Sequence, residues 1–196
     1  MKNLSIKLEI HNKILDSSES IKKSIENIPE IIRIIESITK SLKKGNKIIL
    51  FGNGGSAADA QHIAAELVGR FDYDRKSLPA ISLTTDTSVI TSIGNDYSFE
   101  KIFSRQCESL VNKGDVVVGI STSGNSINVK NGLLVSKRNG AKTIGFLGHK
   151  GGHIKNIVDI PLIVNSNSTP RIQEVHRTAA HIICEIVEKN ISRRSR

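Results

Sequence analysis

The sequence has little sulfur and few aromatic side chains: it contains no tryptophan, one methionine, two cysteines and 4% aromatic residues. It also lacks an apolar run near the ~20 residues that span a bilayer, and residues 1–7 lack the apolar core of a signal peptide. Cys107 and Cys184 lie inside helical patterns without metal-site spacing. These absences argue against a disulfide-stabilised secreted domain and a membrane protein, and we expect a cytoplasmic protein.

Acidic residues are in the minority, because 28 Lys and Arg against 19 Asp and Glu give a net charge of +9. Such a balance invites a nucleic-acid interpretation. However, no nucleic-acid motif is present, and no basic stripe alternates with aromatic residues. The basic residues are dispersed, with one terminal cluster: Lys22, Lys23, Lys43, Lys44, Lys137, Arg138, then Arg193, Arg194 and Arg196. We therefore expect no nucleic-acid partner, and a basic surface that helps to attract an anionic metabolite.

The N-terminal part of the chain has a helical pattern. Up to about residue 44, apolar residues recur at spacings of three and four, which predicts one buried stripe. This stripe comprises Ile25, Ile28, Ile31, Ile32, Ile35, Ile38 and Leu42. Pro29 either separates two helices or opens the second one.

After residues 45–46 the pattern changes to alternating strands and helices. We predict strands at 47–51, 80–84, 115–120, 142–147 and 158–163, and helices at 56–69, 98–111, 126–138 and 169–190. The alternation predicts a parallel sheet covered on both faces by helices. A chain of 196 residues is long enough for one such α/β domain and too short for two ordinary ones.

Two turns rich in glycine and serine follow two of the predicted strands. Residues 52–56 (GNGGS) and residues 121–126 (STSGNS) each lie between an apolar strand and a predicted helix. In this arrangement, backbone N–H groups converge where a phosphate can bind. Neither turn has the P-loop or the dinucleotide-binding pattern. The alternative for the first turn is a tight, well-capped connection, with Ser56 as N-cap and Asp59 completing a capping box.

The strand order determines whether these turns form one site. If the strands run in the order 2-1-3-4-5, the topological switch point lies between the first and third strands. Both turns follow those two strands, so they would open into one crevice. Together they predict a site for a phosphorylated small molecule.

Polar residues share faces on two of the predicted helices. His62 and Glu66 are four residues apart, and Arg70 continues their face by another step of four. A His/Glu pair at this spacing can bind a divalent metal, and two further nitrogen or oxygen ligands would complete a tetrahedral zinc site.

On the last predicted helix, which begins at Thr169 and Pro170, Gln173 and His181 share a face with Arg177 between them. Gln is a poor zinc ligand, which weakens the metal interpretation. The alternative is that His62 and Glu66 form a surface pair and that His181 is a core histidine. His176 lies away from the Gln173/His181 face and fits a core histidine better.

Four segments together resemble the phosphoheptose isomerases, a family of the SIS (sugar isomerase) superfamily. The segments are 52–62 (GNGGSAADAQH), 94–96 (GND), 120–126 (ISTSGNS) and 171–176 (RIQEVH). The resemblance covers nearly the whole chain. The turns alone would indicate only an SIS domain; the combination of His62, Glu66, Gln173 and His181 points to this isomerase family.

The resemblance implies a three-layer SIS fold, in which helices flank a five-stranded parallel sheet of flavodoxin-like order. Residues 1–196 would form a single SIS domain, and residues 1–44 would be a helical extension packed on the domain and on partner subunits. Family members are homotetramers with sites at subunit interfaces.

The resemblance also implies roles for individual residues. The phosphate would be held by Ser56, Ser121, Thr122, Ser123 and Ser126. The sugar site would be lined by Asn53, Gly54, Gly55, Asn95 and Asp96, with Arg70, Glu66 and Gln173 also binding substrate. Zinc would be bound by His62, Glu66, Gln173 and His181, and protons would be moved by Glu66 and His181. Pro170 departs from the pattern, because some relatives have an acidic residue there.

The implied reaction interconverts sedoheptulose 7-phosphate and D-glycero-D-manno-heptose 7-phosphate through an enediol, for bacterial surface-polysaccharide precursors. Coordination to zinc makes a carboxylate less basic, so Glu66 either leaves the metal during the reaction or zinc chiefly polarises sugar oxygens. Two alternatives remain. One is a non-catalytic SIS protein that binds a partner protein or senses a sugar phosphate, and the other is an SIS isomerase for another sugar phosphate. A base and an acid together argue against the first.

Overall fold

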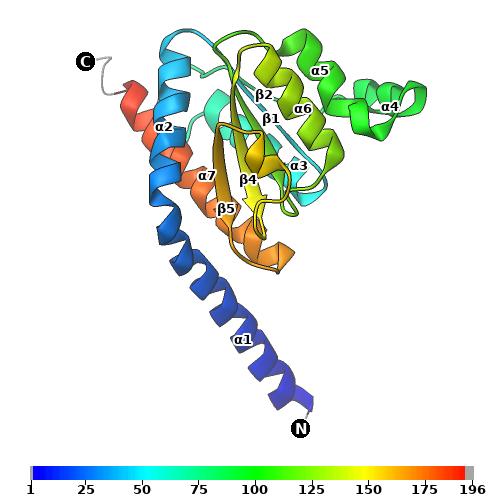
Figure 1. The fold of residues 1–196 in the computed structure, drawn as a ribbon. Helices are drawn as coiled ribbons and strands as arrows, with labels where there is room; N and C mark the ends of the chain where they lie inside the picture. Colours follow the sequence, from blue (N-terminus) through cyan, green and yellow to red (C-terminus); the bar gives the residue numbers. More distant parts are fainter. Residues whose placement is uncertain (1, 193–196) are drawn as a thin grey trace.

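Within residues 2–192, which the computed structural model describes, five parallel strands form one sheet in the order β2-β1-β3-β4-β5 (Figure 1). The strands are β1 (Ile48–Gly52), β2 (Ala80–Ser82), β3 (Val116–Ser121), β4 (Lys142–Gly148) and β5 (Ile160–Val164). All pairings between neighbouring strands are parallel. β1 and β3 are neighbours, so the predicted α/β class, strand order and switch point are confirmed.

Helices alternate with these strands. They are α1 (Lys2–Lys23), α2 (Ile28–Lys43), α3 (Gly55–Val68), α4 (Thr87–Asp96), α5 (Ile102–Leu110), α6 (Ile127–Arg138) and α7 (Thr169–Ser192). Short 3-10 segments are η1 (Ser24–Asn27), η2 (Phe99–Lys101) and η3 (Ile154–Asn156). The basic residues Arg193, Arg194 and Arg196 lie outside the described residues.

Two apolar clusters separate the three layers. On one face of the sheet, α2, α3 and α7 pack on strand residues such as Leu50 and Val118. On the other face, α5 and α6 pack on residues such as Ile49 and Val117. Successive residues of β1 and β3 therefore point to opposite layers, and all are buried. This explains why these strands read as continuous apolar runs rather than as alternating patterns.

The N-terminal helices only partly follow the predicted stripe. Pro29 lies in the first turn of α2, and η1 separates α2 from α1, as one of the two interpretations of Pro29 predicted. The C-terminal members of the stripe are buried, but Ile25, Ile28 and Ile32 are exposed. Ile25 and Ile28 precede the buried part of α2, which begins at Ile31. Ile32 lies about 100° around the helix from Ile31 and so faces away from the sheet.

Helix α4 was not predicted. Its sequence, TSVITSIGND, is rich in β-branched residues and contains glycine, and both lower intrinsic helix propensity. The Asp86 carboxylate caps the helix by accepting the Val89 N–H at 2.9 Å. The predicted helix at 98–111 is divided into η2 and α5, and α4 packs against these two elements.

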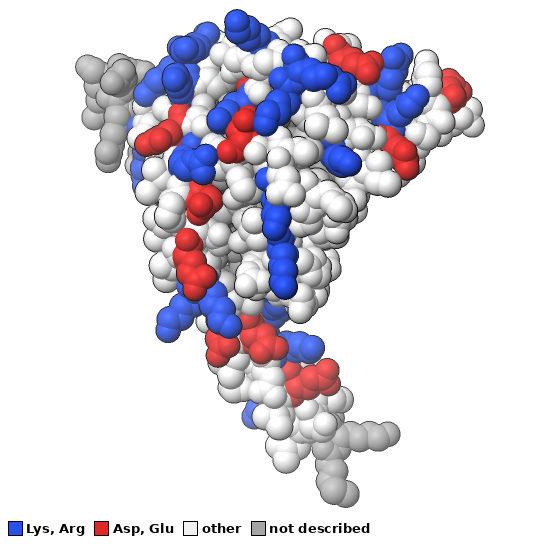
Figure 2. Space-filling view, viewed as in Figure 1, with Lys and Arg blue, Asp and Glu red and all other residues white. Residues whose placement is uncertain are grey.

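Charged residues are mixed on the surface. Figure 2 shows Lys and Arg side chains spread over the upper part of one face with acidic side chains among them. Within residues 2–192, no helix combines the length and hydropathy that a membrane span requires.

Candidate active site and metal centre

The two glycine- and serine-rich turns lie next to each other at the carboxyl edge of the sheet. Gly52 at the end of β1 pairs with Ile120 near the end of β3. The Asn53 and Asn128 side-chain amides then exchange two hydrogen bonds, each 2.9 Å long. Asn53 belongs to the first turn and Asn128 to the first turn of α6, so this amide pair joins both turns into one site.

Hydroxyl groups and a helix N-terminus line the second turn. The Ser121 Oγ atom lies 2.9 Å from Ser126 Oγ and 3.4 Å from Ser123 Oγ. The N-cap residue Ser126 makes no side-chain capping bond to α6, and the Val129 N–H donates to Asn128 Oδ1 at 2.9 Å, which leaves the N–H groups of Ile127 and Asn128 for a ligand. Thr122 is partly exposed between the serines. Hydroxyls and free helix N–H groups can together bind a phosphate without a lysine.

Glycine at position 124 is required by the packing of this turn. Its φ angle is +67°, and an added Cβ atom would lie 2.2 Å from the Gly151 carbonyl oxygen. The loop that follows β4 also donates the His153 N–H to Asn125 Oδ1 at 3.0 Å. The shape of the second turn therefore depends on a segment that is distant in sequence.

The first turn differs from the predicted capping box. Gly54, with φ of +54°, takes the N-cap position of α3, so Ser56 is a buried residue inside the first turn of the helix. Asp59 does not complete a capping box, because its carboxylate instead accepts hydrogen bonds from Arg177 on α7. The capping-box interpretation is therefore wrong, although Ser56 remains beside the turn.

Helices α3 and α7 meet along a line of matched side chains. Gly55 faces Gln173, since a Cβ atom at Gly55 would lie 2.4 Å from Gln173 Nε2. One turn further on, Asp59 pairs with Arg177, and His62 then meets His181. We call this set, together with Glu66, the α3–α7 seam.

Three chemically active side chains converge on this seam. The His62 Nε2 atom lies 2.8 Å from His181 Nε2 and 3.2 Å from Glu66 Oε1. Because a neutral imidazole carries one donor and one acceptor, one of the two rings can donate its N–H to the other. His62 is exposed, and Glu66 and His181 are partly buried, so the group is open to solvent on one side. We call these three residues the His/Glu cluster.

The donor set of the His/Glu cluster suits zinc. One ligand atom from each residue can be chosen so that all three lie within 4.8 Å of one another. Two imidazoles and one carboxylate, with a fourth position for water or substrate, are a common ligand set of catalytic zinc. The contact described for Gln173 is with Gly55, so its role as a zinc ligand stays a prediction.

Three predicted site residues lie outside this arrangement. The prediction that Arg70 continues the face of His62 and Glu66 is wrong, because α3 ends at Val68 and Arg70 is exposed in the following loop. Asn95 and Asp96 occupy the C-terminal end of α4, where their side chains bond to each other at 2.9 Å. Their roles in substrate binding stay predictions.

His176 is a core histidine, as predicted. Its Nε2–H donates to the Leu147 carbonyl oxygen at 3.1 Å, and its ring packs 5.5 Å from that of Phe146. The side chain is 1% exposed, and burial lowers its pKa from 6.5 to about 4. His176 therefore stays neutral at physiological pH and takes no part in the His/Glu cluster.

Comparison with known proteins gives the family. The SIS domain model matches residues 12–148. A phosphoheptose isomerase from Geotalea daltonii is 54% identical over 188 residues, which is 95% of each chain. One from Clostridium acetobutylicum is 53% identical over 191 residues, covering 97% of this chain and 96% of the relative. The chain belongs to the phosphoheptose isomerase family.

A solved structure supports the family assignment. The structure of phosphoheptose isomerase from Neisseria gonorrhoeae has a TM-score of 0.89 at 37% sequence identity, covering 94% of this chain and 99% of that chain. The expected SIS fold and isomerase class are therefore confirmed. Asn128 and the Asp59–Arg177 pair were missed as site components, although Asp59 and Arg177 occur at matching steps on the two helices.

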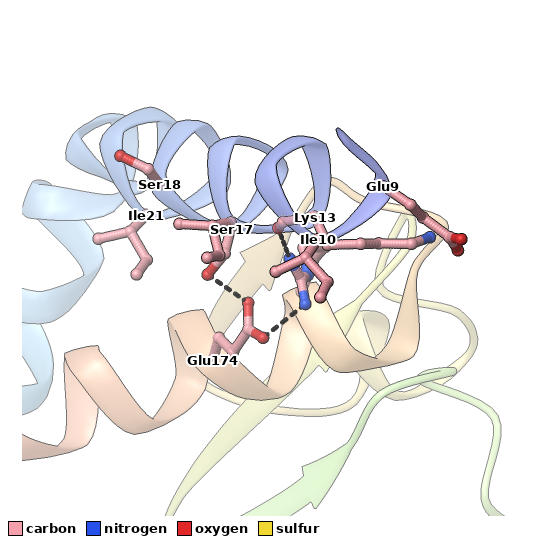
Figure 3. Close-up of a pocket in the computed structure, with 9 residues that line it drawn as sticks. Glu9, Ile10, Lys13, Ser17, Ser18, Ile21 and Glu174 are labelled. Atoms are coloured by element: carbon pink, nitrogen blue, oxygen red, sulfur yellow. Dashed lines mark hydrogen bonds and ion pairs between the residues drawn. The ribbon is translucent and has the colours of Figure 1, made fainter. Parts of the chain in front are cut away.

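A separate hollow lies beside α1 (Figure 3) and has a volume of about 590 Å³. There Glu174 accepts hydrogen bonds from Ser17 Oγ–H and Arg171 Nη2, both at 2.7 Å. Arg171 Nη1 also donates to the Lys13 carbonyl at 2.5 Å. These contacts attach α1 to the first turns of α7. The residues of the His/Glu cluster do not line this hollow.

Proposed function

We propose that the chain interconverts sedoheptulose 7-phosphate and D-glycero-D-manno-heptose 7-phosphate at the α3–α7 seam. The observation that carries this proposal is the His/Glu cluster, in which His62 and Glu66 on α3, the helix that the first turn begins, meet His181 on α7. A phosphate at the two turns would leave the sugar chain free to extend along α3 toward the cluster. Phosphate binding away from the reacting carbons orients the substrate.

Proton transfer between adjacent sugar carbons requires a base and a partner acid. Glu66 is the carboxylate of the cluster, and we assign it the removal and return of the carbon-bound proton. His181 lies across the seam and is placed to exchange a proton with the sugar oxygens. His62, 3.2 Å from Glu66 Oε1, fixes the orientation of that carboxylate.

His62, Glu66 and His181 would hold the zinc ion, with Gln173 as the predicted fourth ligand. When bound, zinc would polarise the sugar oxygens and so stabilise negative charge that develops on them. Glu66 then has a double role, as ligand and as base.

We also propose a homotetramer with sites at subunit interfaces. Within α1, large apolar side chains are exposed, among them Leu8, Ile10 and Ile14. Asn95 and Asp96 end α4, which packs on η2 and α5 and projects from the body of the molecule away from α7 (Figure 1). We therefore propose that they line a sugar site of a neighbouring subunit. In this proposal residues 1–196 act as one SIS domain, and residues 1–44 contact partner subunits.

The cytoplasm is the compartment that we propose, since Cys107 and Cys184 are free, buried thiols of the kind kept in reducing compartments. The alternative of a sugar-phosphate sensor is less well supported, because a sensor does not need the base and the acid of the His/Glu cluster.

A coupled assay tests the activity directly. Purified protein is given sedoheptulose 7-phosphate, arabinose 5-phosphate and a hexulose phosphate in parallel, each with and without chelator. We expect turnover of the heptulose phosphate, its loss on chelation and its recovery with added zinc. If no sugar phosphate is turned over, the sensor function is favoured. If another sugar phosphate is preferred, the substrate assignment is wrong. If activity is complete without metal, the proposed role of zinc is wrong.

A further inference from the structure

An ion pair lies one helical turn from the His/Glu cluster. Asp59 on α3 is 4% exposed, and its Oδ1 atom accepts hydrogen bonds from Arg177 Nε at 3.1 Å and from Arg177 Nη2 at 2.5 Å. Two N–H groups of one guanidinium therefore converge on one carboxylate oxygen. Such a charge-assisted pair fixes direction as well as distance.

The positions of the pair couple it to the cluster. Asp59 precedes His62 by three residues, and Arg177 precedes His181 by four, so both pairs lie on the facing sides of α3 and α7. The helices are far apart in sequence and have no direct connection. The distance of 2.8 Å between His62 Nε2 and His181 Nε2 therefore depends on how α3 and α7 are held relative to each other.

The Gly55–Gln173 contact, on the same side of the His/Glu cluster, fixes the relative position of α3 and α7 less firmly. At Gly55 the Gln173 amide approaches a backbone without a side chain, so this contact joins no pair of charges. A buried carboxylate, in contrast, cannot lose its partner without a large desolvation penalty. Both helices also pack on the sheet, and the Asp59–Arg177 pair, in which Asp59 is buried and Arg177 is 56% exposed, adds a directional charged contact on this side of the cluster.

We propose that Asp59 and Arg177 are positioning residues for the isomerase reaction, because their ion pair holds His62 and His181 at the separation that the reaction and the metal require. This inference rests on the proposed role of the His/Glu cluster. Neither residue is assigned a proton transfer. The pair acts through the two helices, and a displacement of about 1 Å at a reacting group can lower a rate by about 100-fold.

Three variants test the inference. Arg177→Gln leaves the Asp59 carboxylate without its charged partner. Asp59→Asn combined with Arg177→Gln removes both charges and leaves an amide–amide contact that folds without an unpaired charge. Arg177→Lys keeps the charge but replaces two converging donors by one ammonium group. The matched control is Arg105→Gln, which breaks the exposed Arg105–Glu108 pair on α5.

Each protein is characterised in two ways at a temperature where it is fully folded. The first is kcat and KM for sedoheptulose 7-phosphate, and the second is the zinc affinity of metal-free protein by competition with a chromogenic chelator. We expect Arg177→Gln and the double variant to lose roughly 10-fold in kcat and in zinc affinity, with little change in KM. Arg177→Lys should recover part of both losses, and Arg105→Gln should match the wild type.

Wild-type kcat and zinc affinity in all variants would overturn the inference. So would full recovery of both in the double variant, because the pair would then only stabilise the fold. The kcat comparison stands even if the wild type takes up no zinc. A Glu66→Gln variant distinguishes a failure of the proposed active site from a failure of the positioning role. If this variant keeps turnover, the proposed active site is wrong. If it is inactive while the Arg177 variants behave as wild type, only the positioning role is wrong.

Discussion

Glu188 on α7 and Arg75 in the loop after α3 form a buried ion pair, with Arg75 Nε 2.8 Å from Glu188 Oε1. The same carboxylate accepts the backbone N–H groups of Phe71, Asp72 and Tyr73 at 2.7–3.0 Å. Burial by itself would raise the pKa of Glu188. The three N–H groups, with the Arg75 charge, outweigh burial and hold that pKa below its ordinary value.

Arg75 connects this pair to the active site. Its Nη2 donates to the Glu66 carbonyl at 3.0 Å, and its Nη1 donates to the Leu67 carbonyl at 2.9 Å. The Phe71 ring lies 6.0 Å from the ring of His181. The Arg75–Glu188 pair therefore ties the end of α3 and the following loop to α7, on the other side of the His/Glu cluster from Asp59.

Replacement of Glu188 by Gln should destabilise the fold. The variant leaves the Arg75 guanidinium, itself only 5% exposed, without a counter-charge, so we expect a loss of about 3 kcal/mol in the free energy of unfolding at pH 7. Urea unfolding measures it. Glu185→Gln, which changes a more exposed pair with Lys189, should cost less than about 1 kcal/mol. Equal midpoints for the two variants would contradict the prediction.

The wild-type protein should become less stable as the pH is lowered, because of His176. The pKa of His176 is about 4 in the folded protein, whereas its ordinary value, which applies to the unfolded chain, is 6.5. As the pH is lowered, the unfolded chain therefore binds a proton at this side chain before the folded protein does. The stabilisation is therefore complete above pH 6.5 and is lost as the pH falls toward 4, in total on the order of 3 kcal/mol.

The His176→Gln variant removes this titration and keeps a side-chain N–H for the Leu147 carbonyl. The stability difference between wild type and variant should shrink steadily from pH 6.5 to pH 4, in urea unfolding at several pH values. His11→Gln, at an exposed position on α1, is the control and should follow the wild type. A difference that stays constant over this range would show that His176 does not titrate in this way.

Glu66→Gln should abolish most turnover and leave the fold intact. General base catalysis contributes roughly 100- to 10,000-fold, so we expect kcat to fall by at least about 100-fold. The side chain is partly exposed, and its isosteric amide can still contact His62. Steady-state kinetics with circular dichroism checks both parts, with Glu108→Gln on α5 as control. Activity within threefold of the wild type would remove Glu66 from the mechanism.

His62→Asn should weaken zinc binding by about 100-fold or more, because it removes one of two imidazole ligands. The measurement is zinc titration of chelator-treated protein. His11→Asn is the matched histidine change outside the cluster and should keep the wild-type affinity. Unchanged zinc affinity in His62→Asn would place the metal elsewhere.

Gly124→Ala should distort the second turn. The new Cβ atom would collide with the Gly151 carbonyl, and the positive φ angle disfavours alanine. We expect a KM for the sugar phosphate raised about 10-fold or more and a loss of stability of at least about 1 kcal/mol. Gly94→Ala is the stability control: among residues 2–192, no heavy atom outside its chain neighbours and the nearby helix backbone lies within 4 Å of its added Cβ, and alanine favours the helix. Equal melting temperatures for both variants would contradict this account.

Much of the fold could be predicted from the sequence because the signals are local. Apolar runs such as 47–51 and 115–120, each followed by small residues and a helix, predict the parallel sheet and both turns. The position of α4 could not be predicted, since its β-branched residues do not favour a helix, and the Asp86 cap together with packing on α5 decides its conformation. Arg70 was placed wrongly because the step of four from Glu66 was continued beyond the end of α3, whose C-cap is Gly69.

The sequence by itself determined the family, the two phosphate-type turns and the residues His62, Glu66, Gln173 and His181, because these depend on residue type and on spacing along one element. Only the tertiary structure decided that His62 and His181 meet, that Asp59 pairs with Arg177 rather than capping α3, and that Glu188 holds Arg75. These contacts join α3 and its loop to α7 across more than a hundred residues. Spacing within a helix specifies which side chains share a face, but the packing of both helices on one sheet decides which faces meet.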